Sequence, residues 1–206
     1  MPDSSDSIHS RSPPGVYEAL QKATIGIAGC GGLGSNIAVM LARCGAGRLV
    51  IADFDSVEIS NLNRQCYSLK DIGRPKTDAL ADVLHSIVPD IVIEAHRERL
   101  DEDSIPSVFR GCDVICEAFD SAESKAMILS AVLERLPGKP IICGNGMGGI
   151  SDPSGMSVRK VADRVYICGD GRSDMGLGVC APRVTICAGM MANTAIQILL
   201  GRDEDV

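Results

Sequence analysis

The feature that most restricts the fold of this 206-residue chain is the glycine-rich segment Gly29-Cys30-Gly31-Gly32-Leu33-Gly34. It follows a β-branched run, TIGIA at residues 24–28, and precedes an apolar-periodic segment that ends at Gly45. Glycines tolerate positive φ angles and let the backbone approach a ligand closely, and the N-terminus of the next helix presents amide donors to an anion. A strand, a glycine turn and a helix in this order are typical of a dinucleotide-binding βαβ unit. The segment therefore predicts a nucleotide site; the alternative is a tight βα turn without a ligand.

The rest of the chain alternates between strand-like and helix-like segments, which predicts an α/β fold. Aromatic residues make up only 3% of the chain, so we expect a core of aliphatic side chains and Cys, which suits a parallel sheet covered by helices. We expect a Rossmann-like doubly wound, mostly parallel sheet, then an irregular glycine-rich C-terminal part and a final packing helix. The expected strands cover residues 24–29, 48–53, 91–96, 112–119 and 140–145, a hairpin pairs 156–161 with 164–168, and helices are expected over 16–22, from Pro75 to 87, near 101–111, over 121–136 and over 183–201.

Composition indicates the domain organisation and the location of the protein. Residues 1–14 are polar and rich in Ser and Pro, which predicts a flexible arm, and residues 15–206 are expected to form a single nucleotide-binding domain. The net charge of −7 argues against a nucleic-acid groove, which needs a positive surface. The nine cysteines form no CxxC pair and stand mostly in apolar runs, where a free thiol acts as a small hydrophobe. Since no signal peptide or long apolar span is present, we expect a cytoplasmic protein without a membrane partner.

An acidic residue at the end of the second expected strand points to the sugar of the nucleotide. Asp53 stands where an acid binds ribose hydroxyls in folds of this kind. The alternative is that Asp53 and Asp55 only shape a turn, for which Asp is well suited. The glycine segment and this acid fit an NAD-dependent dehydrogenase as well as an ATP-binding protein, so they leave the chemistry open.

Two cations and one further acid lie beyond the expected strand ends, where ligands of open α/β sheets bind. Arg64 stands in the long loop within Ser60-Asn61-Leu62-Asn63-Arg64-Gln65. Lys76 lies in the first turn of the next expected helix, where a bound phosphate would offset its conflict with the helix dipole. The alternative is that both are solvated surface charges. Asp120 follows the fourth expected strand and has two interpretations: a helix N-cap, completed by Glu123, or a ligand of Mg²⁺ on a triphosphate.

Four segments taken in order resemble one family. GCGGLGS at 29–35, DFDSVEISNLNRQ at 53–65, GRPK at 73–76 and EAFDSAES at 117–124 are similar to the ThiF/MoeB/HesA family of ubiquitin-activating-like adenylyltransferases. The similarity runs from about residue 24 to residue 201, and SNLNRQ is its most specific part. The short length and the segment APRV at 181–184 resemble the compact form of this family in anaerobic bacteria.

The resemblance implies an enzyme, a nucleotidyltransferase that uses ATP and Mg²⁺ to adenylate the C-terminal glycine carboxylate of a small ubiquitin-like sulfur carrier protein, ThiS in thiamine thiazole biosynthesis. It also implies a homodimer. By this resemblance Asp53 would contact the ribose, Asn61 and Arg64 the phosphates, Lys76 the α-phosphate and Asp120 the magnesium. The implied catalytic residues are Arg64, Lys76 and Asp120, and the implied nucleotide-binding residues are Gly29, Gly31, Gly32, Gly34, Asp53, Asp55, Ser60, Asn61, Arg64, Lys76 and Ser121.

The chain departs from the family pattern in three places. It lacks the two CxxC pairs that hold structural zinc in many relatives, so no zinc is expected. The segment 172–174 has no Cys where many relatives carry one that links to the carrier; Cys168 and Cys180 lie nearby, and each is expected to be buried and inert. Arg11 is the candidate for the N-terminal arginine that reaches the partner subunit in relatives. These departures leave open a carrier-binding scaffold without turnover, adenylation of a small-molecule carboxylate and, more distantly, an NAD-dependent dehydrogenase.

Overall fold

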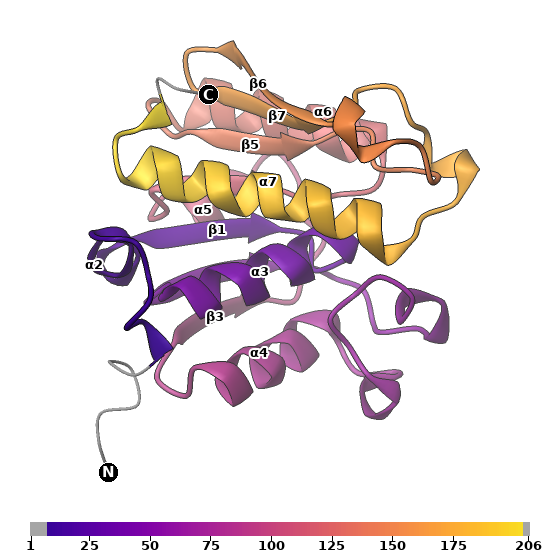
Figure 1. Ribbon diagram of the computed structural model, residues 1–206, viewed down its shortest axis with the longest axis horizontal. Helices are drawn as coiled ribbons and strands as arrows, with labels where there is room; N and C mark the ends of the chain where they lie inside the picture. Colours follow the sequence, from indigo (N-terminus) through magenta and orange to yellow (C-terminus); the bar gives the residue numbers. More distant parts are fainter. Residues whose placement is uncertain (1–7, 204–206) are drawn as a thin grey trace.

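The computed structural model describes residues 8–203 of the chain, and its strands within that range form one sheet in the order β3-β2-β1-β4-β5-β7-β6 (Figure 1). Neighbouring strands are parallel except β6, which is antiparallel to β7. The strand order reverses between β1 and β4, and in open α/β sheets such a reversal opens a crevice at the carboxyl ends of the strands. The strands are β1 (Thr24–Ala28), β2 (Arg48–Ala52), β3 (Val92–His96), β4 (Val114–Glu117), β5 (Ile141–Gly144), β6 (Ser157–Ala162) and β7 (Val165–Gly169).

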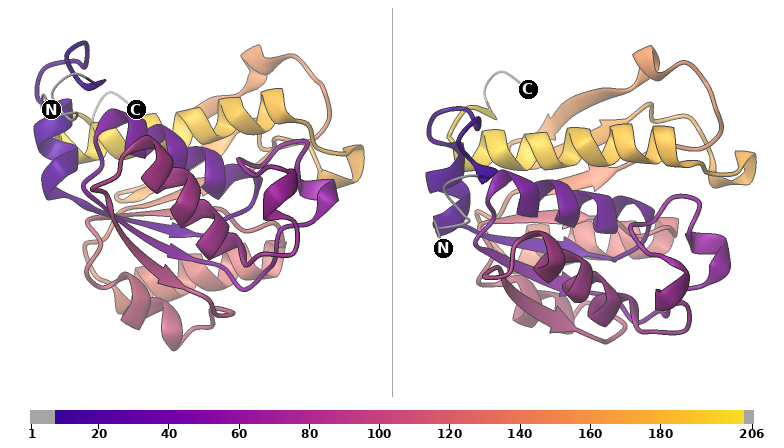
Figure 2. Two further views of the ribbon diagram at one scale, coloured as in Figure 1. Left: turned by 90° about the horizontal axis from the view of Figure 1, so that it is seen from below. Right: turned by 60° about the horizontal axis from the view of Figure 1, so that its bottom comes forward.

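Helices cover both faces of the sheet, as a doubly wound fold requires (Figure 2). The helices α3, α4 and α7 lie on one face, and α5 and α6 lie on the other. Each face has its own buried cluster of aliphatic and Cys side chains. The helices are α2 (Val16–Lys22), α3 (Gly32–Cys44), α4 (Lys76–Ile87), α5 (Ser104–Phe109), α6 (Ala122–Arg135) and α7 (Ala181–Leu199), and short 3-10 turns include η1 (Ile59–Asn61), η2 (Leu69–Asp71), η3 (Pro153–Gly155) and η4 (Met175–Leu177).

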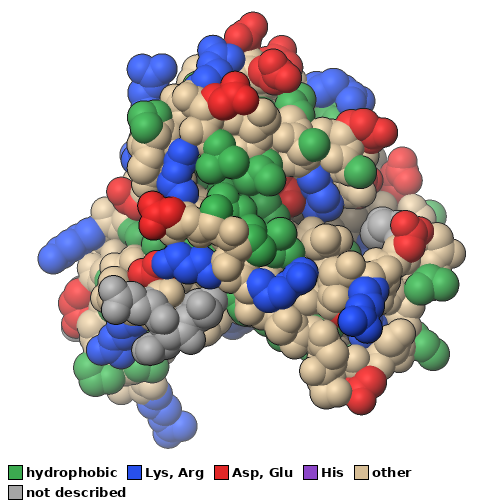
Figure 3. Space-filling model, turned by 90° about the horizontal axis from the view of Figure 1, so that it is seen from above, with side chains coloured by type: hydrophobic (Ala, Val, Ile, Leu, Met, Phe, Trp, Pro, Cys, Tyr) green, Lys and Arg blue, Asp and Glu red, His purple; other side chains and the backbone are tan. Residues whose placement is uncertain are grey.

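The strand β6 forms one edge of the sheet, and its sequence limits further strand pairing. Arg159 and Lys160 are exposed on it, and the register with β7 shifts between Lys160 and Ala162. Charged side chains and a bulge are the usual protection of an edge strand. Figure 3 looks onto this side of the molecule, where side chains of both charges border a hydrophobic patch. Among residues 8–203, no helix has the length and apolar character needed to cross a membrane.

The predicted fold class is confirmed, and the differences from the predicted elements concern their ends. The helix predicted near 101–111 covers only six residues, because the Asp101 carboxylate accepts the amides of Asp103 and Ser104 and so forms a turn before the helix. The final helix starts at Ala181, earlier than predicted, with Pro182 in its first turn, a position that Pro favours.

The flexible arm predicted over residues 1–14 stays a prediction, since residues 1–7 lie outside the described residues. Within the described part, the ring of His9 stacks on that of Tyr17 with 4.6 Å between the ring centroids. His9 lies close to Gly45 at the C-terminal end of α3, the end of that helix that faces away from the glycine turn.

Candidate nucleotide-binding site

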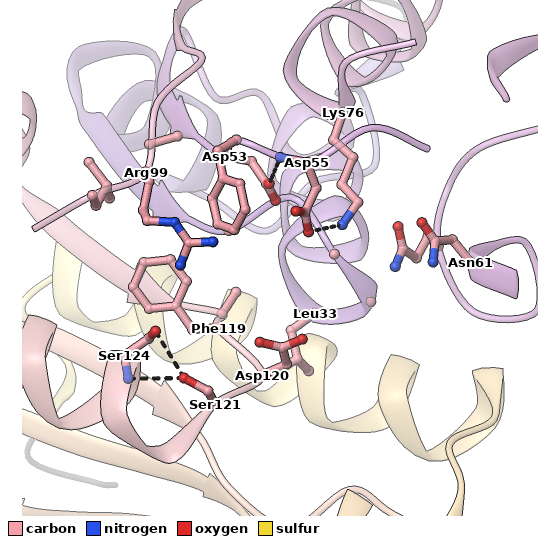
Figure 4. Close-up of a pocket in the computed structure, with 18 of the residues that line it drawn as sticks. Leu33, Asp53, Asp55, Asn61, Lys76, Arg99, Phe119, Asp120, Ser121 and Ser124 are labelled. Atoms are coloured by element: carbon pink, nitrogen blue, oxygen red, sulfur yellow. Dashed lines mark hydrogen bonds and ion pairs between the residues drawn. The ribbon is translucent and has the colours of Figure 1, made fainter. Parts of the chain in front are cut away.

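A cleft of about 780 Å³ lies at the carboxyl ends of β1, β2 and β4, where the strand order reverses (Figure 4). The segments that line it are far apart in sequence: the glycine turn, the end of β2, the loop before α4, the β3–α5 loop and the β4–α6 turn. The predicted site residues that line the cleft are Gly29, Gly31, Gly32, Asp53, Asp55, Asn61, Arg64, Lys76, Asp120 and Ser121.

The glycine turn has the geometry of an anion site, and one of its glycines serves packing alone. Gly29 has φ of 97°, and α3 begins at Gly32 with no side chain capping its first amides. These open amide donors, together with the helix dipole, favour an anion at this point. Gly34 does not line the cleft: a Cβ atom there would lie 1.8 Å from the carbonyl oxygen of Gly29. Gly34 therefore lets the strand end and the helix come together.

Asp53 fastens the glycine turn to the end of β2. Its Oδ2 accepts a hydrogen bond of 2.6 Å from the amide of Cys30, and its Oδ1 accepts one of 2.8 Å from the amide of Asp55. Burial raises the pKa of Asp53, whereas these two amides and Lys76 act in the opposite direction. A carboxylate oxygen has a second lone pair, so these turn-shaping contacts leave Asp53 able to accept from a ligand. Its contact with ribose stays a prediction.

Lys76 is a buried cation that faces the cleft, so the alternative of a solvated surface charge is wrong for it. Only 7% of Lys76 is exposed, and its Nζ lies 2.8 Å from Oδ2 of Asp55. Pro75 precedes the helix instead of lying in its first turn, because its extended ψ of 136° makes Lys76 the first helical residue. Asp55 therefore holds the ammonium group at the N-terminus of α4.

The loop between β2 and α4 brings Asn61 and Arg64 to the cleft and leaves Ser60 outside it. Asn61 is buried, and its Oδ1 accepts the amide of Glu58. Arg64 donates to the carbonyl oxygen of Ser60 at 3.1 Å, which leaves other guanidinium donors for a ligand. Ser60 is exposed, and its hydroxyl donates to Glu58. Gln65, which the sequence analysis did not single out, lines the cleft with 8% exposure and a buried Oε1 that has no hydrogen-bond partner.

Asp120 is not the N-cap of α6. Ser121 is the cap: its Oγ accepts the amide of Ser124 at 3.1 Å. Within the described part of the chain, the Asp120 carboxylate makes no hydrogen bond or ion pair, and it is exposed at the cleft (Figure 4). Of the two interpretations of Asp120, the cap is therefore wrong. The predicted capping box with Glu123 is also wrong, since that box needs Asp120 as the cap.

Residues 8–203 contain no group of three or more His, Cys, Asp or Glu side chains able to hold a metal ion. A divalent cation near Asp120 would therefore complete its coordination with ligand and water oxygens. That is the usual situation of Mg²⁺ bound with a triphosphate, which takes one or two carboxylates from the protein.

Part of the cleft lining is apolar and was not foreseen from the sequence. Leu100, Phe119 and Met127 line it and belong to the cluster on the α5–α6 face. Arg99 lies beside them in the lining, with its guanidinium carbon 3.9 Å from the centroid of the Phe54 ring. Arg99 makes no hydrogen bond or ion pair with any other described residue. The polar loop RERL at 97–100 carries no motif that would have identified it.

The remaining predicted residues lie outside the cleft. Cys168 is buried, and burial raises the pKa of its thiol to about 12, as expected for an inert cysteine. Cys180 is only half-buried, 3.7 Å from the carbonyl oxygen of Gly149, so the expectation that it is buried is wrong. It precedes the first turn of α7, which the chain reaches through an exposed loop. Arg11 is exposed and does not line the cleft of its own chain.

Comparisons with known proteins agree with this geometry. The sequence model of the ThiF family matches residues 6–206. A sulfur carrier protein adenylyltransferase of Thermus thermophilus is 32% identical over 132 residues, which cover 64% of this chain and 48% of that protein. Ubiquitin-like modifier-activating enzyme 5 of Oryza sativa is 28% identical over 191 residues, which cover 86% of this chain and 42% of that enzyme. The chain spans less than half the length of these curated relatives.

Solved structures show the same fold. The E. coli tRNA N6-threonylcarbamoyladenosine dehydratase TcdA superposes with a TM-score of 0.85 at 20% identity, over 97% of this chain and 95% of that chain. The E. coli protein MccB, solved with ATP, superposes with a TM-score of 0.72 at 20% identity, over 91% of this chain and 58% of that chain.

Proposed function

The chain belongs to the ThiF family, and from that premise we propose that it is an ATP- and Mg²⁺-dependent adenylyltransferase. Its substrate is the C-terminal glycine carboxylate of a small ubiquitin-like sulfur carrier protein of the ThiS kind, in thiamine thiazole biosynthesis. The observation that carries the proposal is the cleft, in which the glycine turn, Arg64, Lys76 and Asp120 come together from separate segments of the chain.

The reaction matches what the cleft contains. A carboxylate oxygen attacks the α-phosphorus of ATP, the new C–O–P bond forms, and the bond to the β-phosphate breaks to release pyrophosphate. A carboxylate with a reference pKa near ~4 is already ionised at neutral pH, so the step needs no general base. The enzyme has to align two anions and offset the charge that develops on pyrophosphate. Two cations, open backbone amides and one free carboxylate suit this task better than acid–base catalysis.

The polar and apolar parts of the lining support one arrangement of ATP in the cleft. The phosphates lie over the glycine turn at the start of α3, within reach of Arg64 and Lys76. The purine packs against the apolar part of the lining, formed by Leu100, Phe119 and Met127, and the ribose lies beside Asp53. A triphosphate that binds Lys76 also competes with the carboxylate of Asp55 for the ammonium group.

Asp120 is the residue that would hold Mg²⁺. Its carboxylate faces the cleft without any protein partner among residues 8–203, which fits an oxygen ligand reserved for a cation. When bound, the ion neutralises part of the phosphate charge.

The carrier class is supported by the Thermus relative, whose name states that it adenylates a sulfur carrier protein. The intact set of cations favours turnover over a scaffold that only binds the carrier. We also propose a cytoplasmic homodimer. Exposed apolar side chains on η1 and η2 and in the loops before α7, such as Ile59, Leu69, Ile150 and Leu177, provide surface for a protein partner.

A second candidate substrate is a carboxylate on a modified tRNA nucleoside. The superposition with TcdA over 97% of this chain favours it. The net charge of −7 opposes it, because tRNA binding relies on cationic surface. We therefore rank the protein carrier first.

The test is pyrophosphate exchange into ATP, measured with a ThiS-like carrier, with tRNA and with small carboxylic acids. Carrier-dependent exchange is expected, with a loss of about tenfold or more in Arg64→Ala and Asp120→Ala. Arg135→Met, which removes a surface ion pair with Asp103, is the matched control and should exchange like the wild type. Robust exchange by both cleft variants would refute the assigned roles. Exchange with tRNA alone would establish the second candidate instead.

A further inference from the structure

Behind the wall of the cleft, an ion pair between a fully buried carboxylate and a half-buried ammonium group joins β4 to α6. Glu117 is the last residue of β4 and has no exposed surface, and Lys125 lies in the first turns of α6. The Nζ of Lys125 lies 3.0 Å and 3.1 Å from the two carboxylate oxygens of Glu117. It also donates a hydrogen bond of 2.8 Å to the carbonyl oxygen of Gly144, the last residue of β5. Lys125 therefore ties the helix to the carboxyl ends of two neighbouring strands.

The same carboxylate holds the turn that leads from β4 to α6. The amide of Phe119 donates a hydrogen bond of 2.7 Å to Oε1 of Glu117. The amide before it, of Ala118, donates one of 2.8 Å to the carbonyl oxygen of Ala28 in β1. The first two amides after β4 are thus both held, one by the neighbouring strand and one by the buried carboxylate. A shift of this turn would break one of these bonds.

The turn held in this way is part of the cleft, but the ion pair is not. All four residues from Ala118 to Ser121 line the cleft, and neither Glu117 nor Lys125 does. The Asp120 carboxylate has no hydrogen bond of its own within residues 8–203, so its direction depends on the backbone that carries it. The pair holds that backbone through the hydrogen bond from the amide of Phe119 to Glu117.

Packing does not require charges at these positions. Glu117 lies beneath α6 on the face where Ile115, Ile141 and Cys143 form a hydrophobic cluster. Burial raises the pKa of Glu117, and the ammonium group of Lys125 and the amide of Phe119 act in the opposite direction. Replacing a buried ion pair by apolar side chains of similar volume is often neutral or stabilising, so the pair is weak evidence for a contribution to stability. A role in geometry accounts for the pair better than a role in stability.

We infer that Glu117 and Lys125 are positioning residues that hold the β4–α6 turn so that the Asp120 carboxylate faces the phosphate end of the cleft. The inference rests on the proposed function, in which the β4–α6 turn contributes Asp120 to the binding of ATP with Mg²⁺. It assigns no chemical step to the pair itself.

The test measures ATP affinity by calorimetry, once with Mg²⁺ and once with EDTA, so it does not depend on a carrier. Glu117→Gln keeps an acceptor for the amide of Phe119 and removes the charge, and Lys125→Met removes the ammonium group. In both variants we expect the ratio of the ATP affinities measured with Mg²⁺ and with EDTA to fall about tenfold. This fall corresponds to the free energy of one charge-assisted hydrogen bond. The affinity measured in EDTA should not change. Lys125→Arg, which keeps the charge, should recover most of the gain. Arg135→Met on the same helix should match the wild type.

Amide hydrogen exchange of Phe119 and Asp120 gives a second readout that needs no nucleotide. Exchange should be faster in Glu117→Gln and Lys125→Met than in the wild type, with α5 and β1 unchanged. The inference would be overturned if Mg²⁺ raised ATP affinity equally in the wild type and in both variants. It would also be overturned if the variants lost the same ATP affinity with Mg²⁺ as with EDTA. A wild-type chain that does not bind ATP would refute the proposed function instead, and the exchange rates would then still decide whether the pair holds the turn.

Discussion

Removing the ammonium group of Lys76 should weaken ATP binding without unfolding the protein. Lys76→Met keeps most of the buried apolar stem, and its partner Asp55 has 46% of its side chain exposed, so the carboxylate left behind remains solvated. The desolvation of the buried Lys76 ammonium group offsets most of its attraction to the solvated Asp55 carboxylate. The pair therefore contributes about 0–1 kcal/mol to stability, and the midpoint of thermal unfolding should hardly change.

The loss of affinity follows from the contacts of Lys76. A charge-assisted hydrogen bond to a phosphate contributes about 1.5–3 kcal/mol. When ATP binds to the wild type, Lys76 loses its ion pair with Asp55, which costs about 0–1 kcal/mol. The difference, about 0.5–3 kcal/mol, corresponds to a Kd for ATP roughly 2- to 160-fold higher in the variant.

Calorimetric titration with ATP and thermal unfolding of the same sample test this prediction together. Lys160→Met is the matched control, since it breaks another lysine pair, with Asp203 at 3.0 Å, far from the cleft. Wild-type affinity in Lys76→Met would refute the reasoning. A large fall in unfolding temperature with a proportionate loss of binding would show that Lys76 acts on stability and not on the nucleotide.

Three further predictions concern the fold around the cleft. Gly34→Ala places a Cβ atom 1.8 Å from the carbonyl oxygen of Gly29, so urea unfolding should show a loss of several kcal/mol, about 3 or more; Gly111→Ala, with open space around its Cβ, should be near neutral. Ser121→Ala removes the N-cap of α6 and should cost about 1 kcal/mol in the same assay. The pKa of Asp170 lies below the usual value for Asp: desolvation raises it, but hydrogen bonds from Ser173 and other donors lower it by more. The ionised Asp170 therefore stabilises the fold fully above the ordinary Asp pKa near ~4, and this contribution is lost as pH falls below it. The free energy of unfolding of Asp170→Asn should accordingly fall less steeply with acid than that of the wild type.

Local sequence patterns were enough to identify the nucleotide fold. The glycine turn after residues 24–28, the apolar run that ends at Gly45 and the acid at Asp53 follow from backbone geometry and short-range periodicity, and the structure has each of them at the predicted place. Lys76 and Asp120 were identified as candidates by their positions after expected strands. Parallel strands in a doubly wound sheet end at one edge, so candidates after several strands come together.

The sequence could not decide between the alternatives for individual side chains. For Asp120, a cap and a metal ligand were equally consistent with the local pattern; the structure shows that Ser121 makes the cap bond one residue later. Gly34 was grouped with the cleft glycines, yet its close approach to the carbonyl oxygen of Gly29 is a packing constraint. Both outcomes depend on the three-dimensional path of the backbone at the turn, which residue types do not encode.

The sequence by itself determined the fold class, the glycine turn and the segment order that identifies the family, because these features arise from interactions between residues close together in the chain. Only the tertiary structure decided which distant residues share the cleft. Arg99 meets Phe54 across the ends of β2 and β3, and Lys125 joins Glu117 to Gly144 across two strands. Such contacts depend on strand order and register, which the whole core determines through packing. The hydrophobic periodicity of one segment does not show which strands lie next to it in the sheet.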